Sequence, residues 1–276
     1  MVDGRPAPAV WLVDKPAGPT SHDIVARIRR ALPRKTKVGH AGTLDPFATG
    51  LLVVLVGSAT RLSRYLVGLS KRYEATFRFG FRSETLDPEG PITDGGPVPS
   101  RPAVLAALAE VAERESQATP AFSAARVDGE RLWQAARRGD ATPGPERTIV
   151  IHELALESFD LNTGDAGVSV HCGSGTYVRQ IAADVGDVLG CGAYCAMLRR
   201  TGVGPWDVAD AVAPGDVTAE GGIDLRAGLP GLGLRRMNAA ERDEIRFGRP
   251  IAAADATGEL VALVDEAGLH AVARRA

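Results

Sequence analysis

The sequence predicts an α+β fold with a large first domain and a small second one. Segments with strand and helix patterns follow one another irregularly, without the regular strand–helix–strand repetition of a doubly wound sheet. A chain of 276 residues, 45% of them hydrophobic, has room for both domains and a substantial core. A Gly- and Pro-rich stretch at residues 225–233 predicts a linker, which places the domains at residues 1–230 and 231–276.

The individual elements follow from local patterns. Thr20, with Asp23 three residues later, is a helix N-cap signature, and apolar residues then recur at helical spacing until Pro33. Residues 51–56 form an apolar, β-branched run that is typical of a buried strand. Further strands are predicted at residues 10–13, 73–81, 149–159, 167–172, 194–198, 260–265 and 269–273, and further helices at residues 102–111, 132–137, 176–189 and 237–246.

The composition argues against a secreted, membrane-spanning or disulfide-stabilised protein. The first nine residues lack a signal sequence, and the longest apolar run, Leu51 to Val56, is far too short to cross a bilayer. The three cysteines, at positions 172, 191 and 195, have neither an even count nor CxxC spacing, which argues against disulfides and a zinc ribbon. We therefore expect a cytoplasmic protein with reduced thiols.

The distribution of charge is more informative than the net charge of −2. Residues 24–44 contain no acid and six bases, and residues 61–82 contain six bases against Glu74 alone. Such segments suit either a phosphate-binding face or ordinary solvated helix surfaces, and charge alone does not choose between them.

Three short segments carry candidate chemistry. In residues 39–50, glycines surround His40 and Asp45, and Pro46 holds Asp45 in an extended conformation before a buried strand. Taken by itself, this pattern favours an ordinary Asp-Pro turn. Residues 172–179 are a Gly-rich turn that leads into a helix, but they match neither GxGxxG nor a P-loop, so no nucleotide cofactor is predicted. Residues 71–73, Lys-Arg-Tyr, open a strand.

Together these segments resemble the tRNA pseudouridine-55 synthase family. The resemblance runs from residue 11 to residue 200 and rests on five motifs in the family's order. They are residues 11–18 (WLVDKPAG), residues 39–50 (GHAGTLDPFATG), residues 71–73 (KRY), residues 84–90 (ETLDPEG) and residues 171–200. The resemblance implies a central, mostly antiparallel mixed sheet with a cleft across it. It also implies an RNA-contacting, thumb-like insertion at residues 122–148 and a small β-rich PUA-like RNA-binding domain at residues 231–276.

The resemblance also assigns roles to individual residues. It implies that Asp45 is the catalytic aspartate, Tyr73 the active-site tyrosine and Arg179 the ion-pair partner of Asp45. A close arginine typically lowers the pKa of an aspartate by about 1–3 units, which would keep the carboxylate ionised. The remaining implied RNA-binding or pocket residues are His40, which we expect to fill the space left by the target base, and Lys15, Tyr177, Leu198 and Arg126.

The implied activity is isomerisation of uridine 55 in the T loop of tRNA to pseudouridine after base flipping. We expect a monomer that binds the T stem-loop and needs no metal, no cofactor, no membrane and no obligate protein partner. Asp45 either attacks covalently or removes a sugar proton, and both routes remain open. Arginines of the insertion, among them Arg126 and Arg131, are expected to fold over the T stem.

Three alternatives and three departures from the family pattern remain. The alternatives are a guide-RNA-dependent pseudouridine synthase, a tRNA-folding chaperone with incidental activity, and a metal hydrolase built on His40 and Asp45, which lacks a third ligand at recognisable spacing. The departures are Ser174 and Arg126, which both stand where the family usually has a lysine, and Phe122, which stands where it usually has a tyrosine. They bear on RNA binding rather than on the reaction.

Overall fold

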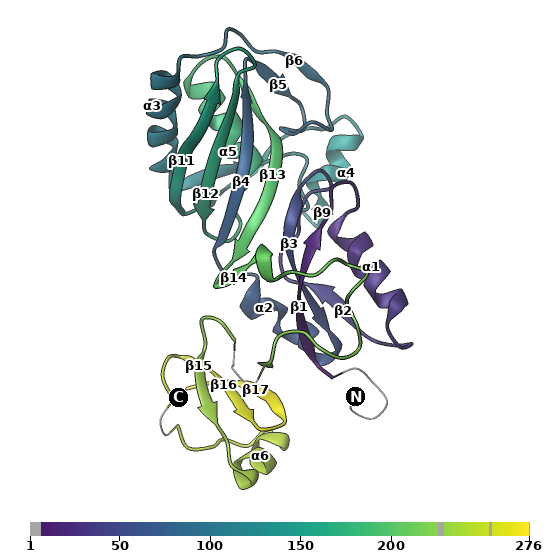
Figure 1. Ribbon diagram of the computed structural model, residues 1–276. Coiled ribbons are helices and arrows are strands. Elements are labelled where there is room, and N and C mark those ends of the chain that lie inside the picture. The colour runs from purple at the N-terminus through teal and green to yellow at the C-terminus, as the bar shows by residue number, and fades with distance from the viewer. Residues whose placement is uncertain (1–6, 226–228, 254–255, 276) are drawn as a thin grey trace.

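The computed structural model describes residues 7–225, 229–253 and 256–275 (Figure 1). Its helices are α1 (Ser21–Ala31), α2 (Ser63–Leu66), α3 (Arg101–Ala112), α4 (Leu132–Arg137), α5 (Val178–Val188) and α6 (Ala239–Arg246). Its strands are β1 (Ala9–Lys15), β2 (Val38–His40), β3 (Thr49–Val56), β4 (Lys71–Phe79), β5 (Phe81–Ser83), β6 (Ile92–Asp94), β7 (Ser116–Thr119), β8 (Arg126–Val127), β9 (Glu130–Arg131), β10 (Gly144–Thr148), β11 (Ile151–Asp160), β12 (Asp165–Cys172), β13 (Ala193–Val203), β14 (Trp206–Asp207), β15 (Gly233–Arg236), β16 (Leu260–Asp265) and β17 (Gly268–Arg274). No helix in this described part of the chain has the length and apolar character that a membrane crossing requires.

An eight-stranded mixed sheet forms the centre of the molecule. Its order is β1-β3-β13-β4-β12-β11, with β2 paired to β3 and β14 paired to β13. Every pair in this sheet is antiparallel except β13 with β3, which meet through two residue pairs, Arg199 with Thr49 and Arg200 with Gly50. The predicted α+β class and the mostly antiparallel mixed sheet are confirmed. The short parallel pairing, which we call the joint, connects the two halves of the sheet.

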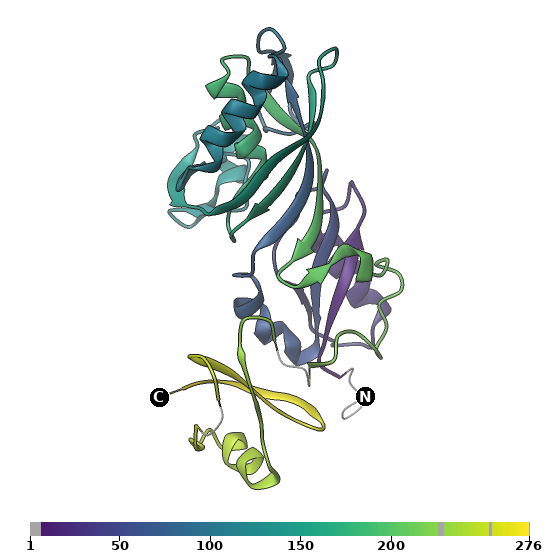
Figure 2. The ribbon, with the colours of Figure 1, turned by 60° about the vertical axis from the view of Figure 1, so that its left-hand side comes forward.

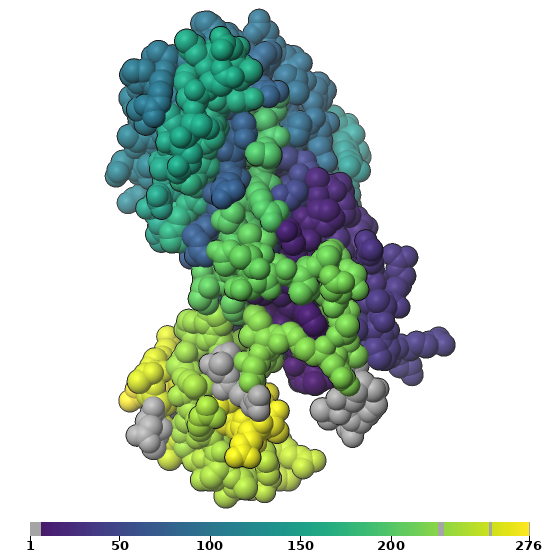
Figure 3. All heavy atoms as spheres, viewed as in Figure 1, coloured from purple at the N-terminus to yellow at the C-terminus, as the bar shows by residue number. Residues whose placement is uncertain are grey.

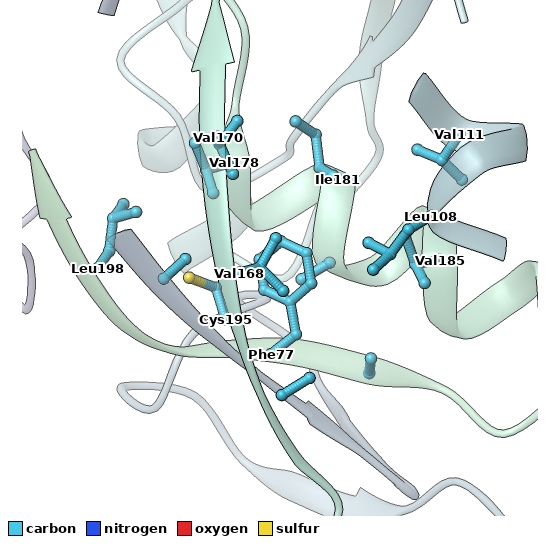
Figure 4. Packing of buried hydrophobic residues seen from close by; sticks show 14 of the residues in the cluster. Phe77, Leu108, Val111, Val168, Val170, Val178, Ile181, Val185, Cys195 and Leu198 are labelled. Atoms are coloured by element: carbon cyan, nitrogen blue, oxygen red, sulfur yellow. The ribbon is translucent and has the colours of Figure 1, made fainter. Parts of the chain in front are cut away.

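The larger half of the sheet has its core on one face, under α3 and α5 (Figures 1 and 2). Alternating residues of β4 and β12 point towards these helices, as period-two patterning requires. Phe77 and Val168 meet Ile181 of α5 and Leu108 of α3 in this layer (Figure 4). The opposite face carries polar side chains, among them the ion pair between Arg78 and Asp165.

The smaller half, built from β1, β2 and β3, packs against α1. The predicted N-cap is present, because the Thr20 hydroxyl accepts from the backbone of Asp23 while the Asp23 carboxylate accepts from the backbone of Thr20. Ile24 and Ile28 then lie fully buried against the strands. Helix α1 ends before Pro33, as the pattern predicts.

The insertion at residues 120–143 is closed at its base by pairing of β7 with β10. It contains the β8–β9 hairpin and α4, whose bounds match the predicted helix at residues 132–137. We call this segment the thumb. Ala136 is its buried hydrophobic residue, and most of its other side chains are partly or fully exposed.

The C-terminal lobe, from residue 229 onward, is a three-stranded sheet of order β15-β16-β17 with α6 beside it. It has its own core around Val261 and Leu263, and Figure 3 shows it as a projection at the foot of the molecule. Leu269 and Val272 of β17 pack against the larger part through the cluster that contains Leu66 and Leu225. Of the predicted linker, residues 226–228 lie outside the described residues.

Several predicted boundaries differ from the structure: the strand predicted at residues 194–198 is part of the longer β13, and the helix predicted from residue 237 begins at Ala239. Three others concern β4, α5 and β15. The strand predicted at residues 73–81 stops at Phe79, because Gly80 adopts a positive φ of 88° and turns the chain into β5. The helix predicted from residue 176 begins at Val178, because Tyr177 has an extended N-cap conformation, with φ −99° and ψ 109°. Gly233, predicted as the end of a linker, is the first residue of β15.

The joint makes a stability prediction. Gly50 has a φ of 102°, and a Cβ atom there would lie 2.3 Å from the carbonyl oxygen of Arg200. We expect Gly50→Ala to lower the free energy of unfolding by about 1–3 kcal/mol more than Gly18→Ala, through overpacking of the backbone. Gly18 is the matched control, because it has a φ of 101° but no heavy atom within 4 Å of the added Cβ. If urea unfolding shows the same decrease in the free energy of unfolding for Gly50→Ala and Gly18→Ala, the joint tolerates a side chain.

Candidate active site

A cavity of about 390 Å³ opens beside the joint, between the two halves of the sheet and the base of the thumb. This volume lies in the range of small-ligand sites. Asp45, Tyr73 and Arg179, which come from three distant parts of the sequence, all line it. Tyr177 and Leu198 line it as well. The three residues to which the family resemblance gives catalytic roles therefore share one cavity.

The loop that carries Asp45 is held on both sides of that residue. On one side, the Ser21 hydroxyl at the start of α1 accepts from the backbone N–H of Leu44 at 2.8 Å and donates to its carbonyl oxygen at 3.0 Å. On the other side, the carbonyl oxygen of Pro46 accepts from Lys15 Nζ at 3.1 Å and from Gly18 N–H at 2.9 Å. The carboxylate is thereby placed by rigid neighbours, as a preorganised site requires.

Lys15 supports this loop from inside the protein and is fully buried. Its ammonium group donates to three carbonyl oxygens, those of Pro16, Pro19 and Pro46. Burial lowers the pKa of Lys15 to about 8, although the nearby Asp45 carboxylate acts in the opposite direction. Lys15 does not line the cavity, so of the two implied roles, lining and supporting, its contacts fit the second.

Arg179 holds the Asp45 carboxylate and uses all five of its N–H groups. Nε and Nη2 donate to the two carboxylate oxygens of Asp45 at 2.9 and 3.3 Å. Nη1 donates to the Thr85 carbonyl at 2.6 Å and to the Asp87 carboxylate at 3.0 Å, and Nη2 also donates to the Phe122 carbonyl at 2.9 Å. The side chain of Arg179 is 3% exposed, whereas that of Asp45 is 33% exposed. The pair thus presents a fixed carboxylate to the cavity and keeps the guanidinium away from solvent.

Asp87 is a site residue to which the sequence analysis gave no role. Its carboxylate is 5% exposed, and it accepts from Arg179, from the Thr85 hydroxyl and from the Glu89 backbone N–H. Burial raises the pKa of Asp87, and these donors oppose that rise. The signal was present in the motif at residues 84–90, which contains an Asp-Pro pair like that of Asp45.

Two cations under the cavity were also missed. Arg200, 1% exposed, donates to the carbonyl oxygens of Leu51, Thr43 and Gly42, and so ties the Asp45 loop to β13. Lys71 is buried, and burial together with the charge of Arg200 lowers its pKa to about 8. Arg200 follows Arg199 directly in β13, and the sequence alone does not show which of the two is buried.

Part of the cavity wall is aromatic and apolar. Leu198 of β13 is almost fully buried, and Tyr73 of β4 is partly buried beside it in the same sheet. Burial is the main cause that raises the pKa of Tyr73, and the facing Arg200 guanidinium opposes it. Tyr177 is clamped by Gln117, whose amide accepts from its backbone N–H and donates to its carbonyl.

Two predicted RNA-contacting residues lie outside the cavity lining. His40 is at the end of β2, partly buried, and its Nδ1 has no hydrogen-bond partner among the described residues. Burial lowers the pKa of His40, so its imidazole is neutral at pH 7. Arg126 is exposed on β8, where it donates to the Gly129 carbonyl. Within residues 7–225, 229–253 and 256–275, no group of three or more His, Cys, Asp or Glu side chains is arranged as a metal site.

The other two departures from the family pattern have clear places in the structure. The Ser174 hydroxyl donates to the Val67 carbonyl at 2.6 Å, so it connects the Gly-rich turn to the end of α2. Phe122 contacts Arg179 through its carbonyl oxygen, a contact that any residue type would make. The replacement of tyrosine by phenylalanine therefore leaves the contact with Arg179 intact.

The lowered pKa of Lys15 makes a pH prediction. Between pH 8 and about 10.4, the unfolded chain binds more protons at this position than the folded protein, so the free energy of unfolding rises with pH. Relative to Lys15→Met, the wild type should gain about 1–2 kcal/mol between pH 8 and 9.5 in urea unfolding. Below pH 8 the difference should stay constant. The exposed Lys37 provides the control variant Lys37→Met. If the difference in free energy of unfolding between wild type and variant is independent of pH for both variants, the pKa of Lys15 is not lowered.

Comparison with protein-family models and with named relatives agrees with this site. The model described as TruB family pseudouridylate synthase, N terminal domain, matches residues 29–178, and that of the tRNA pseudouridylate synthase B C-terminal domain matches residues 179–221. The two matches meet inside the cavity lining, at the start of α5. The chain is 37% identical to tRNA pseudouridine synthase B of Corynebacterium jeikeium over 95% of its own length and 92% of the relative's. The chain is 40% identical to the Thermobifida fusca protein of the same name, over 94% of this chain and 89% of the relative.

Solved structures resemble the fold at lower identity. A chain in the crystal structure of a Cbf5-Nop10-Gar1 complex superimposes with a TM-score of 0.69 and 23% identity, over 96% of this chain and 78% of that one. A chain in the structure of an H/ACA RNP bound to a substrate RNA containing 2′-deoxyuridine superimposes with a TM-score of 0.63 and 23% identity, over 96% of this chain and 77% of that one. The likeness to these structures supports the fold alone. The family models and the full-length relatives show more: this chain belongs to the TruB family of pseudouridylate synthases.

Proposed function

We propose that this protein isomerises the uridine at position 55 in the T loop of tRNA to pseudouridine, with Asp45 as the essential carboxylate. One observation carries the proposal: a carboxylate held bidentately by a buried guanidinium, yet one-third exposed to a cavity of nucleotide-binding size. Family membership and the names of the relatives support the same reaction and the same substrate class.

The reaction breaks the N1–C1′ bond, rotates the uracil and rejoins it to the ribose through C5. No atom is gained or lost, and no electrons leave the substrate, so the required groups are a base or nucleophile near the sugar and a route for one proton. Asp45 supplies the first, either by covalent attack or by removal of a sugar proton. Arg179 keeps the carboxylate oriented and favours its ionised form through both of its hydrogen bonds.

The target base must leave the T loop to reach Asp45, which costs a few kcal/mol of unstacking. Tyr73 and Leu198 offer an aromatic and an apolar surface for the extruded uracil, which offsets part of that cost. Tyr73 lines the cavity with the extruded base, where it helps to position the base or to accept the proton that leaves C5. N1, which has lost its bond to C1′, takes up one proton, so the protons of the reaction balance. His40 fills the vacated space, and the thumb with Arg126 covers the T stem.

We further propose that the enzyme acts as a monomer in the cytoplasm, without a cofactor, a guide RNA or a protein partner. The three cysteines, at positions 172, 191 and 195, are free and buried, in keeping with reduced thiols. Residues 1–230 form the catalytic domain, with an RNA-contacting insertion at residues 122–148, and residues 231–276 form a PUA-like RNA-binding domain. The separate core around Val261 and Leu263 supports this division.

The decisive experiment compares the wild type with Asp45→Asn on an unmodified tRNA transcript, with no other RNA or protein added. We expect Asp45→Asn to lower the rate of pseudouridine formation at position 55 by at least about 10²–10⁴-fold, because the carboxylate is lost. The asparagine amide oxygen can still accept one of the two hydrogen bonds that Arg179 donates to Asp45. The product base is mapped by carbodiimide labelling and primer extension.

The same experiment separates the alternatives. A wild-type protein that forms pseudouridine only when a guide RNA is added would contradict the proposal and favour the guide-dependent reading. An Asp45→Asn variant that keeps full activity would remove Asp45 from the mechanism. A tRNA transcript with cytidine at position 55 controls for modification elsewhere in the molecule.

Asp87 generates a second prediction. Because Asp87 contacts Arg179 but does not line the cavity, Asp87→Asn should act through the position of the Asp45–Arg179 pair. We expect kcat to fall by about 10–100-fold with KM changed less than three-fold, since small misplacements of a reacting group have effects of this size. Asp187→Asn is the matched control, because it removes a carboxylate from the exposed pair with Arg82. Equal kinetics for the two variants would rule out a positioning role.

A further inference from the structure

Four cationic side chains line the cavity, and one of them differs from the others. Lys71, Arg179 and Arg200 each donate to carbonyl or carboxylate oxygens of the protein. Arg147, on β10 at the base of the thumb, has neither a hydrogen-bond acceptor nor a carboxylate partner within the described residues. Its guanidinium instead lies over the Tyr177 ring, 5.4 Å from the centroid.

The Arg147 guanidinium is held in place although it is unpaired. Residue 147 pairs with Gln117 across β10 and β7, and the Gln117 side chain clamps the backbone of Tyr177 in both directions. Strand, amide clamp and aromatic ring therefore form one unit that fixes where the guanidinium points. A cation placed on an aromatic face in this way loses less freedom when it binds a ligand.

The surroundings of Arg147 leave space for an anion. Gly175 has a φ of 89°, and a Cβ atom there would lie 3.5 Å from Arg147 Cζ and Nη2, in direct contact with the guanidinium. With glycine at this position, that side of the guanidinium is not covered by a side chain. The turn beside Arg147, residues 173–176, contains no acidic side chain that would compete with a ligand for the guanidinium.

The charge balance of the cavity identifies the anion. The carboxylate that lines the cavity, Asp45, is paired with Arg179, so the other three lining cations have no carboxylate counterion there. Lys71 and Arg200 are bound by carbonyl oxygens, whereas Arg147 has no such acceptor among the described residues. A uracil base brings no charge, whereas the nucleotide that carries it brings a phosphate on each side. Guanidinium groups bind phosphate oxygens through two parallel N–H donors.

We infer that Arg147 is a phosphate-binding residue, which holds a backbone phosphate flanking the extruded nucleotide. The inference rests on the proposed function and adds to it a contact that fixes the sugar of the target relative to Asp45. Contacts of this kind position a nucleic acid without reading its sequence. Arg147 is therefore a binding residue, and the chemistry remains with Asp45.

The test measures binding of a T stem-loop RNA by Arg147→Gln, in an Asp45→Asn background so that the RNA stays unmodified. We expect Kd to rise by about ten-fold and the slope of log Kd against log salt to fall by roughly one unit, the value for one lost phosphate contact. Arg147→Lys keeps the charge, so it should keep the slope. Arg114→Gln, which removes a cation paired with Asp184 outside the cavity lining, is the matched control.

A second arm identifies the phosphate. Each phosphate that flanks the target nucleotide is replaced in turn by a neutral methylphosphonate. One replacement should weaken binding of the parent about ten-fold and leave binding of Arg147→Gln unchanged within two-fold. If both replacements weaken the two proteins equally, or if Arg147→Gln leaves the salt slope unchanged, the inference is wrong. The binding assay needs no turnover, so its failure is distinct from a failure of the wild type to form pseudouridine.

Discussion

The arrangement of the site depends on the guanidinium of Arg179. Its five N–H groups connect four segments that are far apart in the sequence: the first turn of α5, which carries Arg179, the Asp45 loop, the turn that contains Thr85 and Asp87, and the base of the thumb at Phe122. A buried cation is costly unless every donor is satisfied, and here every donor is. Loss of any partner would leave a donor unpaired, so the four segments hold one another in position.

The cavity lies where the two halves of the sheet meet. The joint consists of two residue pairs, and Arg200 reinforces it by donating to three carbonyl oxygens around the Asp45 loop. Because β3 and β13 run parallel only over this short length, the strands diverge beyond it and leave space between the halves. The same feature that makes the sheet mixed therefore also creates a place for a ligand, lined by one carboxylate and by residues from both halves.

The sequence predicts the elements whose signals are local. Thr20 and Asp23 mark the start of α1, and α4 is predicted with the correct bounds. The four-residue strand β15 carries no comparable signal, because it pairs in parallel with a strand that begins 27 positions further along the chain. Its stability comes from that distant partner rather than from its own residues.

The candidate site could be predicted only in part. Pattern alone favours an ordinary turn at Asp45, and only the family resemblance joins Asp45 with Tyr73 and Arg179. Asp87 and Arg147 were not predicted, because the role of Asp87 depends on its burial and that of Arg147 on its lack of a partner among the described residues. Both are properties of the folded chain. For the same reason, the buried ammonium of Lys15 was expected near the pocket, but its three carbonyl partners were not foreseen.

The closed base of the thumb bears on how this enzyme family can diversify. Residues 120–143 leave and re-enter the protein through the paired strands β7 and β10, so the ends of the insertion are fixed whatever lies between them. Doubling the length of such a loop costs only about 0.6 kcal/mol of closure entropy. Insertions or deletions after residue 125, beyond Phe122 and the cavity lining, can therefore accumulate during evolution and change how much of an RNA is enclosed, while the geometry of the carboxylate stays the same.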